Sequence, residues 1–344
     1  MSWINEKGPL RDVVLSSRIR LARNIASLPF PSIMDDAAGR QALEQVRRSV
    51  EEGGRAFGAS FSFLAMKDLA ALDRQLLVEK HLASPDLMKR AGISALMLDK
   101  DERIGIMINE EDHIRLQCIM PGFQLDKAWE LLNGVDDALE ERIEYAFDEQ
   151  LGYLTSCPTN AGTGLRASTM VHLPALSMTK QMNAILQAIS KIGLTARGLY
   201  GEGSEALGSI YQISNQVTLG PSEDEIIHNL SVAVQQIISK ERQARKALLK
   251  INGIEFEDGI WRAFGILTHA RRLDIKEFMA YISQLRLGIS LGMIPGIPPE
   301  QLDSLLVAAQ PAGIIKQNGK ELSQGELDIL RADYVRSVLG GSPG

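Results

Sequence analysis

Cys-Pro-Thr-Asn-Ala-Gly-Thr-Gly-Leu-Arg, residues 157–166, is the stretch from which the fold and function of this chain are best approached. Pro158 fixes its own φ angle and removes a backbone donor, while Gly162 and Gly164 allow the backbone to come close to a ligand. Arg166 ends the stretch with a planar guanidinium that suits a phosphate group. An anion site and an ordinary glycine-rich connection with a buried cysteine explain these residues about equally well.

Length and composition describe an ordinary globular protein with room for two domains. The chain has 344 residues, of which 45% are hydrophobic and 23% charged. The net charge of −6 gives no general argument for binding to nucleic acid or to a membrane surface. Cys118 and Cys157 are too few for a disulfide framework or a structural zinc site. No apolar run is long enough to span a membrane and the start is no signal peptide, so we expect a cytoplasmic protein.

The segment from Val13 to Asn24 is expected to be a strand, buried at its start and alternating afterwards. Arg18 and Arg20 stand two residues apart, so in an extended chain both side chains project from the same face. Two guanidiniums on one face repel each other unless an anion lies between them. An anion site and a solvated edge strand are both compatible with this pair.

Residues 103–120 predict two strands joined by an acidic turn, whose sequence at 109–112 is Asn-Glu-Glu-Asp. In the second strand Ile114 and Leu116 alternate with polar side chains, so Arg115 is expected on the opposite face, where a ligand could lie. Three consecutive carboxylates most often form a solvated turn. The residues alone therefore leave the role of this turn open.

Two later regions suggest a lid and a long helix. Residues 197–205 are polar and rich in glycine, which suits a loop that orders when a ligand binds. Ser222-x-x-Glu225 predicts a capping box at the start of a long helix, and the basic run 240–250 is expected to be its favourable end. We interpret Arg245 in that run as structural.

The C-terminal part of the chain is expected to be all helical. Asp274 predicts one helix cap, and Ser323-x-x-Glu326 predicts a second capping box. We expect a small domain over residues 253–344 that serves dimerisation or ligand recognition, and a catalytic domain over residues 1–252.

Three motifs in combination resemble the phosphagen (guanidino) kinases. They are Ser-Ser-Arg-Ile-Arg at 16–20, Asn-Glu-Glu-Asp-His at 109–113 and Cys-Pro-Thr-Asn-x-Gly-Thr at 157–163. The resemblance implies an α+β fold, in which an antiparallel sheet flanked by helices forms the catalytic domain. It also implies ATP and Mg²⁺ as cofactors, with no metal ligand from the protein.

The resemblance further implies the roles of individual residues. Glu111 and Glu202 would clamp the guanidinium of the acceptor, and Cys157 would steer it. A mobile loop would begin at Arg197, and Gln212 stands where the family carries an aspartate. The implied nucleotide- and phosphate-binding residues are Ser16, Ser17, Arg18, Ile19, Arg20, His81, Arg115, Arg166, Ala167, Ser168, Thr169, Met170, Arg197, Gly198, Leu199, Tyr200 and Gly201.

Within that family, the chain resembles the protein-arginine kinases of the McsB type. Phosphagen kinases typically carry a helical domain before the Ser-Ser-Arg-Ile-Arg segment, and here that segment begins at Ser16. We expect that domain to be missing and the guanidinium clamp to accept an arginine side chain of a protein. The resemblance implies a cytoplasmic homodimer of protein quality control and the stress response, with an McsA-type activator and Clp proteases as partners. It implies no membrane and no direct nucleic-acid partner.

The same resemblance suggests a phosphoarginine receptor in the C-terminal domain. The nearest string is Arg331-Ala-Asp333, followed by Arg336, which matches the relatives' motif imperfectly.

Two alternatives remain open from the sequence. One is a guanidino kinase that acts on a small metabolite, and the other is an inactive adaptor that binds phosphoarginine. The expected absence of the front domain argues against the first, while Glu111, Glu202 and the phosphate-binding arginines argue against the second.

Overall fold

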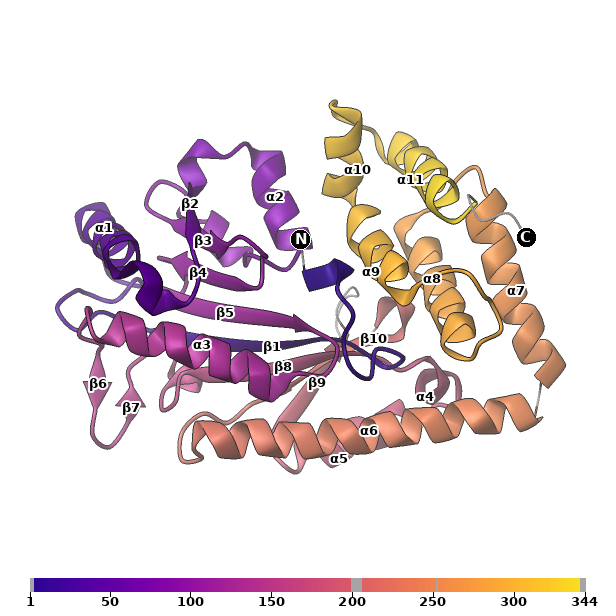
Figure 1. Cartoon of the computed structure of the whole chain (residues 1–344), viewed down its shortest axis with the longest axis horizontal. Coiled ribbons are helices and arrows are strands. Elements are labelled where there is room, and N and C mark those ends of the chain that lie inside the picture. The colour runs from indigo at the N-terminus through magenta and orange to yellow at the C-terminus, as the bar shows by residue number, and fades with distance from the viewer. Residues whose placement is uncertain (1–2, 199–205, 252, 341–344) are drawn as a thin grey trace. The chain divides into compact units, whose positions relative to one another are not determined.

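The computed structural model describes residues 3–198, 206–251 and 253–340, and Figure 1 shows it as a ribbon. The chain forms two compact units whose segments interleave along the sequence. The first unit comprises Met1–Trp3, Ser16–Ser168 and Ser214–Ser231, and the second comprises Ile4–Leu15, Thr169–Ile213 and Val232–Gly344. The predicted domain boundary at 252/253 falls inside the second unit, so that boundary stays a prediction.

A sheet of eight strands is the main β structure of the described residues. Its strand order is β2-β3-β4-β5-β1-β8-β10-β9, and the chain passes from one unit to the other inside β1, β8 and β10. The strands are β1 (Val14–Arg23), β2 (Phe61–Ala65), β3 (Ala95–Asp99), β4 (Ile104–Ile108), β5 (Ile114–Pro121), β8 (Leu165–His172), β9 (Leu194–Gly198) and β10 (Ile210–Asn215), with a small second sheet of β6 (Phe147–Asp148) and β7 (Gly152–Tyr153).

The antiparallel pairing of β1 with β5 confirms the expected strand and its two faces. In the register of these strands, Arg18 lies opposite Ile119 and Arg20 lies opposite Gln117. Ile19 and Leu21 have no exposed surface, whereas Arg18 and Arg20 are only partly buried, so the two arginines share the less buried face. The predicted strand–turn–strand of residues 103–120 is also present, as β4 and β5 paired antiparallel.

Three helices lie within the first unit, and they are α1 (Asp36–Gly53), α2 (Ala71–Glu79) and α3 (Leu125–Glu140). Both α1 and α3 bury apolar residues, whereas α2 has no buried residue. Asp35 caps α1 by accepting a hydrogen bond from the amide of Ala38 at 2.8 Å, which satisfies one of the first N–H groups of the helix. Val46 and Val50 of α1 are buried, while its charged residues are exposed or half-buried.

Most helices of the described residues belong to the second unit. They are α4 (Pro174–Met178), α5 (Met182–Ser190), α7 (Gly253–His269), α8 (Ile275–Ser290), α9 (Pro299–Ala308), α10 (Pro311–Asn318) and α11 (Gln324–Leu339), and the long α6 (Glu223–Ile251) begins in the first unit and continues into the second. All three predicted caps are confirmed, because Ser222 with Glu225, Asp274 with Glu277 and Ser323 with Glu326 form reciprocal capping boxes. The short 3₁₀ helices of both units are η1 (Trp3–Asn5), η2 (Gly54–Phe57), η3 (Met66–Asp68), η4 (Asp86–Met88), η5 (Pro158–Asn160) and η6 (Leu207–Ser209).

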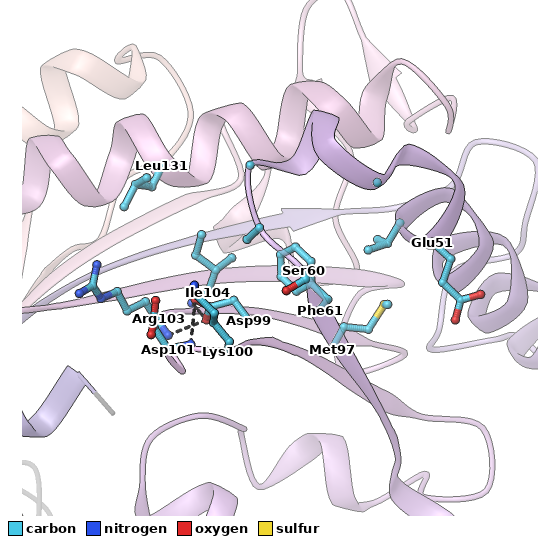
Figure 2. A pocket seen from close by; sticks show the side chains of 14 residues that line it. Glu51, Ser60, Phe61, Met97, Asp99, Lys100, Asp101, Arg103, Ile104 and Leu131 are labelled. Carbon is cyan, nitrogen blue, oxygen red and sulfur yellow. Dashed lines mark hydrogen bonds between the residues drawn. The ribbon is translucent and has the colours of Figure 1, made fainter. Parts of the chain in front are cut away.

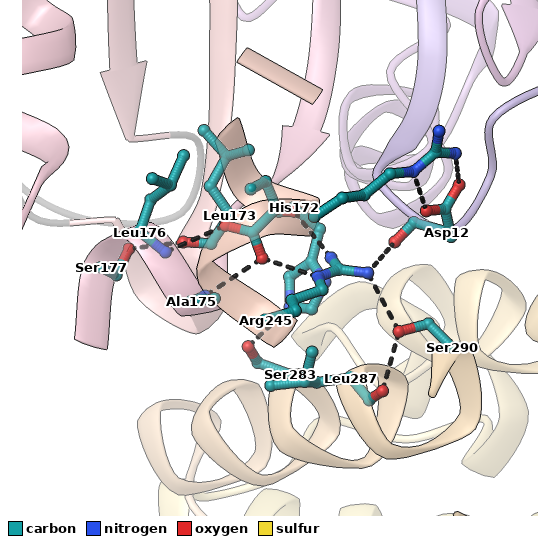
Figure 3. Close-up of polar contacts among 12 residues, drawn as sticks. Asp12, His172, Leu173, Ala175, Leu176, Ser177, Arg245, Ser283, Leu287 and Ser290 are labelled. Carbon is teal, nitrogen blue, oxygen red and sulfur yellow. Dashed lines mark hydrogen bonds and ion pairs between the residues drawn. The ribbon is translucent and has the colours of Figure 1, made fainter. Parts of the chain in front are cut away.

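A buried polar network inside the second unit surrounds Arg245 (Figure 3). The guanidinium donates to Glu241 at 2.8 Å, to the Asp12 carbonyl at 3.1 Å and to Ser290 at 3.0 Å. Glu241 in turn accepts the amides of Ala175 and of Leu176, two groups at the start of α4 that lack helical partners. Arg245 is therefore structural, as predicted, but it is buried inside the protein and not part of a solvated helix end.

No helix among the described residues has both the length and the apolar character that crossing a bilayer requires.

Candidate active site

Four arginines gather on three neighbouring strands of the first unit. Arg18 and Arg20 come from β1, Arg115 from β5 and Arg166 from β8, and β1 lies between β5 and β8 in the sheet. Burial, followed by the charges of Arg115 and Arg166, lowers the pKa of Arg18 to about 10. Burial and the neighbouring guanidiniums also lower the pKa of Arg20, well below its ordinary value. A set of cations that destabilise one another in this way suits a multiply charged anion.

A buried carboxylate, Glu110, lies against this cluster. Nη1 of Arg115 donates to both of its oxygens, at 2.7 and 2.6 Å, and the side chain of Glu110 has no exposed surface. Burial alone would raise the pKa of Glu110, but the charge and hydrogen bonds of Arg115 bring it below its usual value. Glu110 also accepts the amide of Glu111 at 2.8 Å, so one carboxylate contacts both the arginine cluster and the acidic turn.

The acidic turn is shaped by Asn109, which precedes the carboxylates. Its φ angle is +56°, a left-handed conformation that asparagine tolerates better than most residues. Its side-chain amide donates to the carbonyls of Gly39 at 2.7 Å and Ile93 at 2.8 Å, and this ties the turn to the rest of the unit. The turn leaves the Glu111 side chain exposed, while Asp112 is buried.

Glu111 and the segment that carries Cys157 come close together. The Asn160 amide lies 3.5 Å from Oε2 of Glu111, and the Cys157 thiol lies 3.0 Å from the Thr159 hydroxyl. Partial burial and then the charge of Asp112 raise the pKa of Glu111, against the opposing charge of Arg115. Cys157 is half-buried, in contrast to the fully buried Cys118.

The two glycines after Cys157 serve packing within the protein. Both have left-handed φ angles, +103° for Gly162 and +64° for Gly164. A Cβ atom would lie 2.3 Å from the Thr218 carbonyl at Gly162 and 2.6 Å from the Ala22 carbonyl at Gly164. The sequence suggested that these glycines admit a ligand to the backbone, and in the structure the approaching groups belong to the same unit. They are main-chain atoms at Gly162, and the Ala22 carbonyl and the Arg23 guanidinium at Gly164.

His81 also belongs to the first unit, next to the arginines. Burial and the charge of Arg18 lower its pKa to about 4, so it is neutral at physiological pH. Its φ angle is +61°, and its carbonyl accepts a hydrogen bond from Gln117 at 2.9 Å. The ring lies 6.5 Å from that of Trp3, centroid to centroid.

Several predicted nucleotide-binding residues direct their side chains to the protein interior. Ser17 is fully buried, donates to the Gly122 carbonyl and accepts the Gln124 amide, both at 2.9 Å. Ile19 is fully buried in β1. Any contact of Ile19 with a nucleotide would therefore use the main chain. The others in this group are also buried, and they are Ser16, Ala167, Ser168 and Thr169.

The predicted nucleotide-binding residues do not all belong to the same compact unit. Thr169, Met170, Arg197 and Gly198 lie in the second unit, where Arg197 is exposed near the end of β9. Leu199, Tyr200, Gly201 and the catalytic candidate Glu202 lie outside the described residues. The structure thus brings together Arg18, Arg20, His81, Arg115, Arg166, Glu111 and Cys157 in one unit.

The candidate phosphoarginine receptor has one member in the protein interior. Arg331 has no exposed surface, and it donates to the carbonyls of Ala309 at 2.9 Å and Leu273 at 2.8 Å and to Asp328 at 3.0 Å. Asp333 and Arg336 form an ion pair at the surface of α11. Arg331 holds helices together in this structure, and a receptor at Asp333 and Arg336 stays a prediction.

A pocket of about 710 Å³ in the first unit contains none of the predicted site residues (Figure 2). Its walls include Phe61, Met97 and Leu131. Asp99, which also lines it, is committed to a turn, because it accepts the amides of Arg103 and Ile104 at 2.7 Å each. The pocket therefore lies outside the candidate site.

Comparison with known proteins identifies the family. Residues 42–244 match the model of the ATP:guanido phosphotransferase C-terminal catalytic domain, and residues 253–343 match that of the protein-arginine kinase McsB C-terminal domain. The protein-arginine kinase of Caldanaerobacter subterraneus is 50% identical over 96% of this chain and 97% of its own length. That of Desulforamulus reducens is 48% identical over 98% of this chain and 95% of its own. The chain belongs to the protein-arginine kinase family.

A solved structure supports the fold of this protein-arginine kinase family member. Lombricine kinase matches with a TM-score of 0.58 and 28% identity, covering 69% of this chain and 68% of that one. The predicted α+β fold with an antiparallel sheet and a helical C-terminal region is confirmed, as is the resemblance read from the three motifs.

Three residues of the candidate site were not predicted from the sequence. Glu110, Asn109 and Asp112 stand in the Asn-Glu-Glu-Asp-His motif, in which only Glu111 was given a role. A signal was present, since a run of carboxylates ends three residues before Arg115 in an adjoining strand, and adjacent opposite charges often pair. Which of the carboxylates pairs with the arginine depends on the turn geometry.

Proposed function

We propose that this protein transfers the γ-phosphoryl group of ATP to the guanidinium of arginine side chains in proteins. The observation that carries the proposal is the convergence of Arg18, Arg20, Arg115 and Arg166 beside the turn that presents Glu111. The cations suit a triphosphate, and an adjacent exposed carboxylate suits a guanidinium. The family membership supports the same reaction.

The arginine cluster would stabilise the charge of the transferring group. Phosphoryl transfer passes through a loose transition state with charge spread over the phosphoryl oxygens, and positioning and electrostatic stabilisation supply most of the catalysis. The lowered pKa values of Arg18 and Arg20 indicate that positive charge is already concentrated at this site before an anion binds. Mg²⁺, when bound with ATP, would neutralise part of the phosphate charge.

The acceptor presents a different problem, because the guanidinium of arginine has a pKa above ~12 and is a poor nucleophile. Glu111 would hold this planar group by charge-assisted hydrogen bonds and accept a proton as the new P–N bond forms. The raised pKa of Glu111 makes it a better proton acceptor than an ordinary exposed glutamate. Cys157 and the Glu202 position, which lies outside the described residues, would complete the clamp.

The test is incubation with ATP, Mg²⁺ and an arginine-rich protein, followed by mass spectrometry under non-acidic conditions, because acid breaks P–N bonds. We expect phosphoarginine with the unchanged protein. Glu111→Gln should lose at least ~10²-fold in turnover while it still binds ATP, because it loses both the charged clamp and the alignment.

The matched control is Glu52→Gln, which alters an exposed ion pair with Arg48 on α1. Its turnover should be normal. Absence of phosphoarginine with the unchanged protein would refute the proposed function. Normal turnover of Glu111→Gln would refute only the role given to Glu111 and would leave the proposed function standing.

The family resemblance supports wider proposals about the cellular role. We propose a cytoplasmic homodimer that works with an McsA-type activator and marks stress-damaged proteins for Clp-type proteolysis. The dimer is tested by light scattering at several protein concentrations. Addition of a purified activator to the arginine-kinase assay tests the second part, and an unchanged rate would contradict it.

A further inference from the structure

Asp112 holds two separate segments of the first unit against the turn that carries Glu111. Its Oδ1 accepts the amide of Ser156 at 2.7 Å and the side-chain amide of Asn24 at 2.7 Å. Ser156 directly precedes Cys157, and Asn24 directly follows the last residue of β1. One carboxylate oxygen therefore connects the acidic turn, the thiol-bearing segment and the strand of the phosphate-binding arginines.

Asn24 completes this connection from the other side. It is 1% exposed, and its amide group also donates to the Leu154 carbonyl at 3.1 Å. Its carbonyl oxygen accepts the amide of His113 at 2.9 Å. Asn24 thus bonds to Leu154 near the thiol-bearing segment and to Asp112 and His113 in the acidic turn. Both the amide nitrogen and the carbonyl oxygen of its side chain form hydrogen bonds.

Because Asp112 is buried, its hydrogen bonds matter for the stability of this arrangement. The residue is 2% exposed, and burial raises its pKa, against the lowering effect of the hydrogen bonds from Ser156 and Asn24. A buried carboxylate is costly unless its hydrogen bonds are made, so the native arrangement strongly favours the one geometry that makes them. Glu111 lies next to Asp112, and Cys157 lies next to Ser156, so this geometry also sets the spacing of the two candidate catalytic side chains.

We propose that Asp112 is a positioning residue, which holds Cys157 in a fixed position relative to Glu111 through the Asn24–Asp112–Ser156 bridge. This inference rests on the proposed function only for its effect on turnover. Asp112 itself contacts no reacting atom in this scheme. Its effect is on alignment, and a misplacement of about 1 Å can cost on the order of 10²-fold in rate.

Three substitutions separate the parts of the proposal. Asp112→Asn keeps an oxygen that can accept both amides, so turnover should stay within about threefold of normal. Asp112→Glu keeps charge and acceptor but lengthens the side chain by one methylene. Asp112→Ala removes the acceptor. The last two should lower kcat on a protein substrate by about tenfold or more, with the Kd for ATP changed less than about twofold.

The exposed Asp258 supplies the matched control. Asp258→Ala removes an aspartate that forms a surface ion pair with Arg262, and it should leave both constants unchanged.

A second measurement does not depend on kinase activity. Alkylation by iodoacetamide, followed by mass spectrometry, reports the exposure of Cys157, and the fully buried Cys118 reports unfolding. Asp112→Ala and Asp112→Glu should alkylate at Cys157 at least about threefold faster than the unchanged protein, with Cys118 protected. Asp112→Asn should alkylate at the normal rate.

The outcomes are distinct. Normal kcat and normal Cys157 alkylation in Asp112→Ala or Asp112→Glu would overturn the inference, as would an Asp112→Asn variant as impaired as Asp112→Ala. If Asp112→Ala alkylates at Cys118 and so has unfolded, the comparison of Asp112→Glu with Asp112→Asn decides. If the unchanged protein produces no phosphoarginine, the proposed function fails, and the alkylation rates still decide whether the bridge positions Cys157.

Discussion

Glu110 accepts two hydrogen bonds from Nη1 of Arg115, at 2.7 and 2.6 Å, within a cluster that includes three further arginines. The pair is buried, since the Glu110 side chain has no exposed surface and that of Arg115 is 18% exposed. Even with this pair formed, the charges of Arg18, Arg115 and Arg166 lower the pKa of Arg20, so the guanidiniums still repel one another. An incoming triphosphate would relieve that repulsion.

The first prediction follows from the buried pair of Glu110 and Arg115. Glu110→Gln keeps the shape of the side chain but removes its charge, and it leaves Arg115 without its buried counter-ion. The loss should destabilise the nucleotide-free protein by roughly 3–5 kcal/mol. Bound ATP would supply the missing negative charge, so ATP should raise the melting temperature of the variant more than that of the unchanged protein. Thermal unfolding with and without ATP measures this, and an equal ATP-induced shift in both proteins would contradict it.

The second prediction concerns which arginines bind phosphate. Arg20→Ala and Arg166→Ala each remove a charge from the cluster and should weaken ATP binding by about tenfold or more. Arg262→Ala is the matched control, because this side chain is 75% exposed and pairs with Asp258 on the surface of α7. Nucleotide titration by calorimetry is the measurement. Similar losses in all three variants would show that the cluster is not the nucleotide site.

The third prediction compares two neighbouring arginines of α6. Arg245 pairs with Glu241, and their side chains are 4% and 0% exposed, whereas Arg242 pairs with Asp12 at 44% and 30% exposure. Arg245→Ala leaves a buried carboxylate without its cation and should lower the free energy of unfolding by roughly 3–5 kcal/mol. Arg242→Ala should cost less than about 1 kcal/mol. Chemical denaturation measures both, and comparable losses would mean that burial does not decide the effect.

Much of the strand pattern could be predicted from the sequence, because alternation along a strand is a local property. The shared face of Arg18 and Arg20 and the opposite burial of Ile19 followed directly from it. The bridge between Asn24 and Asp112 could not be predicted in this way, since these residues lie 88 positions apart. Their meeting depends on the pairing of β1 with β5 and on the turn at Asn109.

The same limit applies to the surroundings of two glycines and of Arg331. Gly162 and Gly164 suggested contact with a ligand, and only the fold shows that Thr218 and Ala22 occupy that space. The family resemblance made Arg331 a candidate for a phosphoarginine receptor, and only the packing of α11 shows that its guanidinium lies in the interior. Short motifs specify residue types, while the direction of each side chain is set by tertiary packing.

The fourth prediction concerns pH and His113. Burial, and then the nearby charge of Arg90, lowers the pKa of His113 to about 4, although the hydrogen bond to the Pro29 carbonyl acts in the opposite direction. The unfolded chain has a histidine pKa near ~6.5, so between these values the unfolded state binds more protons than the folded state. The contribution of neutral His113 to the free energy of unfolding should therefore be fully present above pH ~6.5. It should fall as the pH drops toward 4, by on the order of 3 kcal/mol.

The measurement is denaturant unfolding at several pH values, with His113→Gln as the variant. The variant should be less stable at pH 7, because the ring accepts the Ile25 amide at 3.2 Å and contacts the Pro29 carbonyl at 3.1 Å. Its stability should nevertheless depend less on pH between 6.5 and 4. An unchanged pH dependence would assign the effect to other groups.

The last prediction concerns the size of the acceptor. The Glu111 side chain is exposed, so an arginine that projects from the surface of a large molecule could reach it. Free arginine brings charged amino and carboxylate groups that lose hydration at the site and need partners there. A polypeptide presents neutral amides beside its arginine, and its contacts away from the guanidinium help to align the reacting nitrogen. The ratio kcat/KM should therefore be higher, by about tenfold or more, for an arginine within a protein than for free arginine. Both acceptors are compared at the same ATP concentration with phosphoarginine as the measured product, and a higher kcat/KM for the free amino acid would favour a kinase of small guanidino metabolites instead.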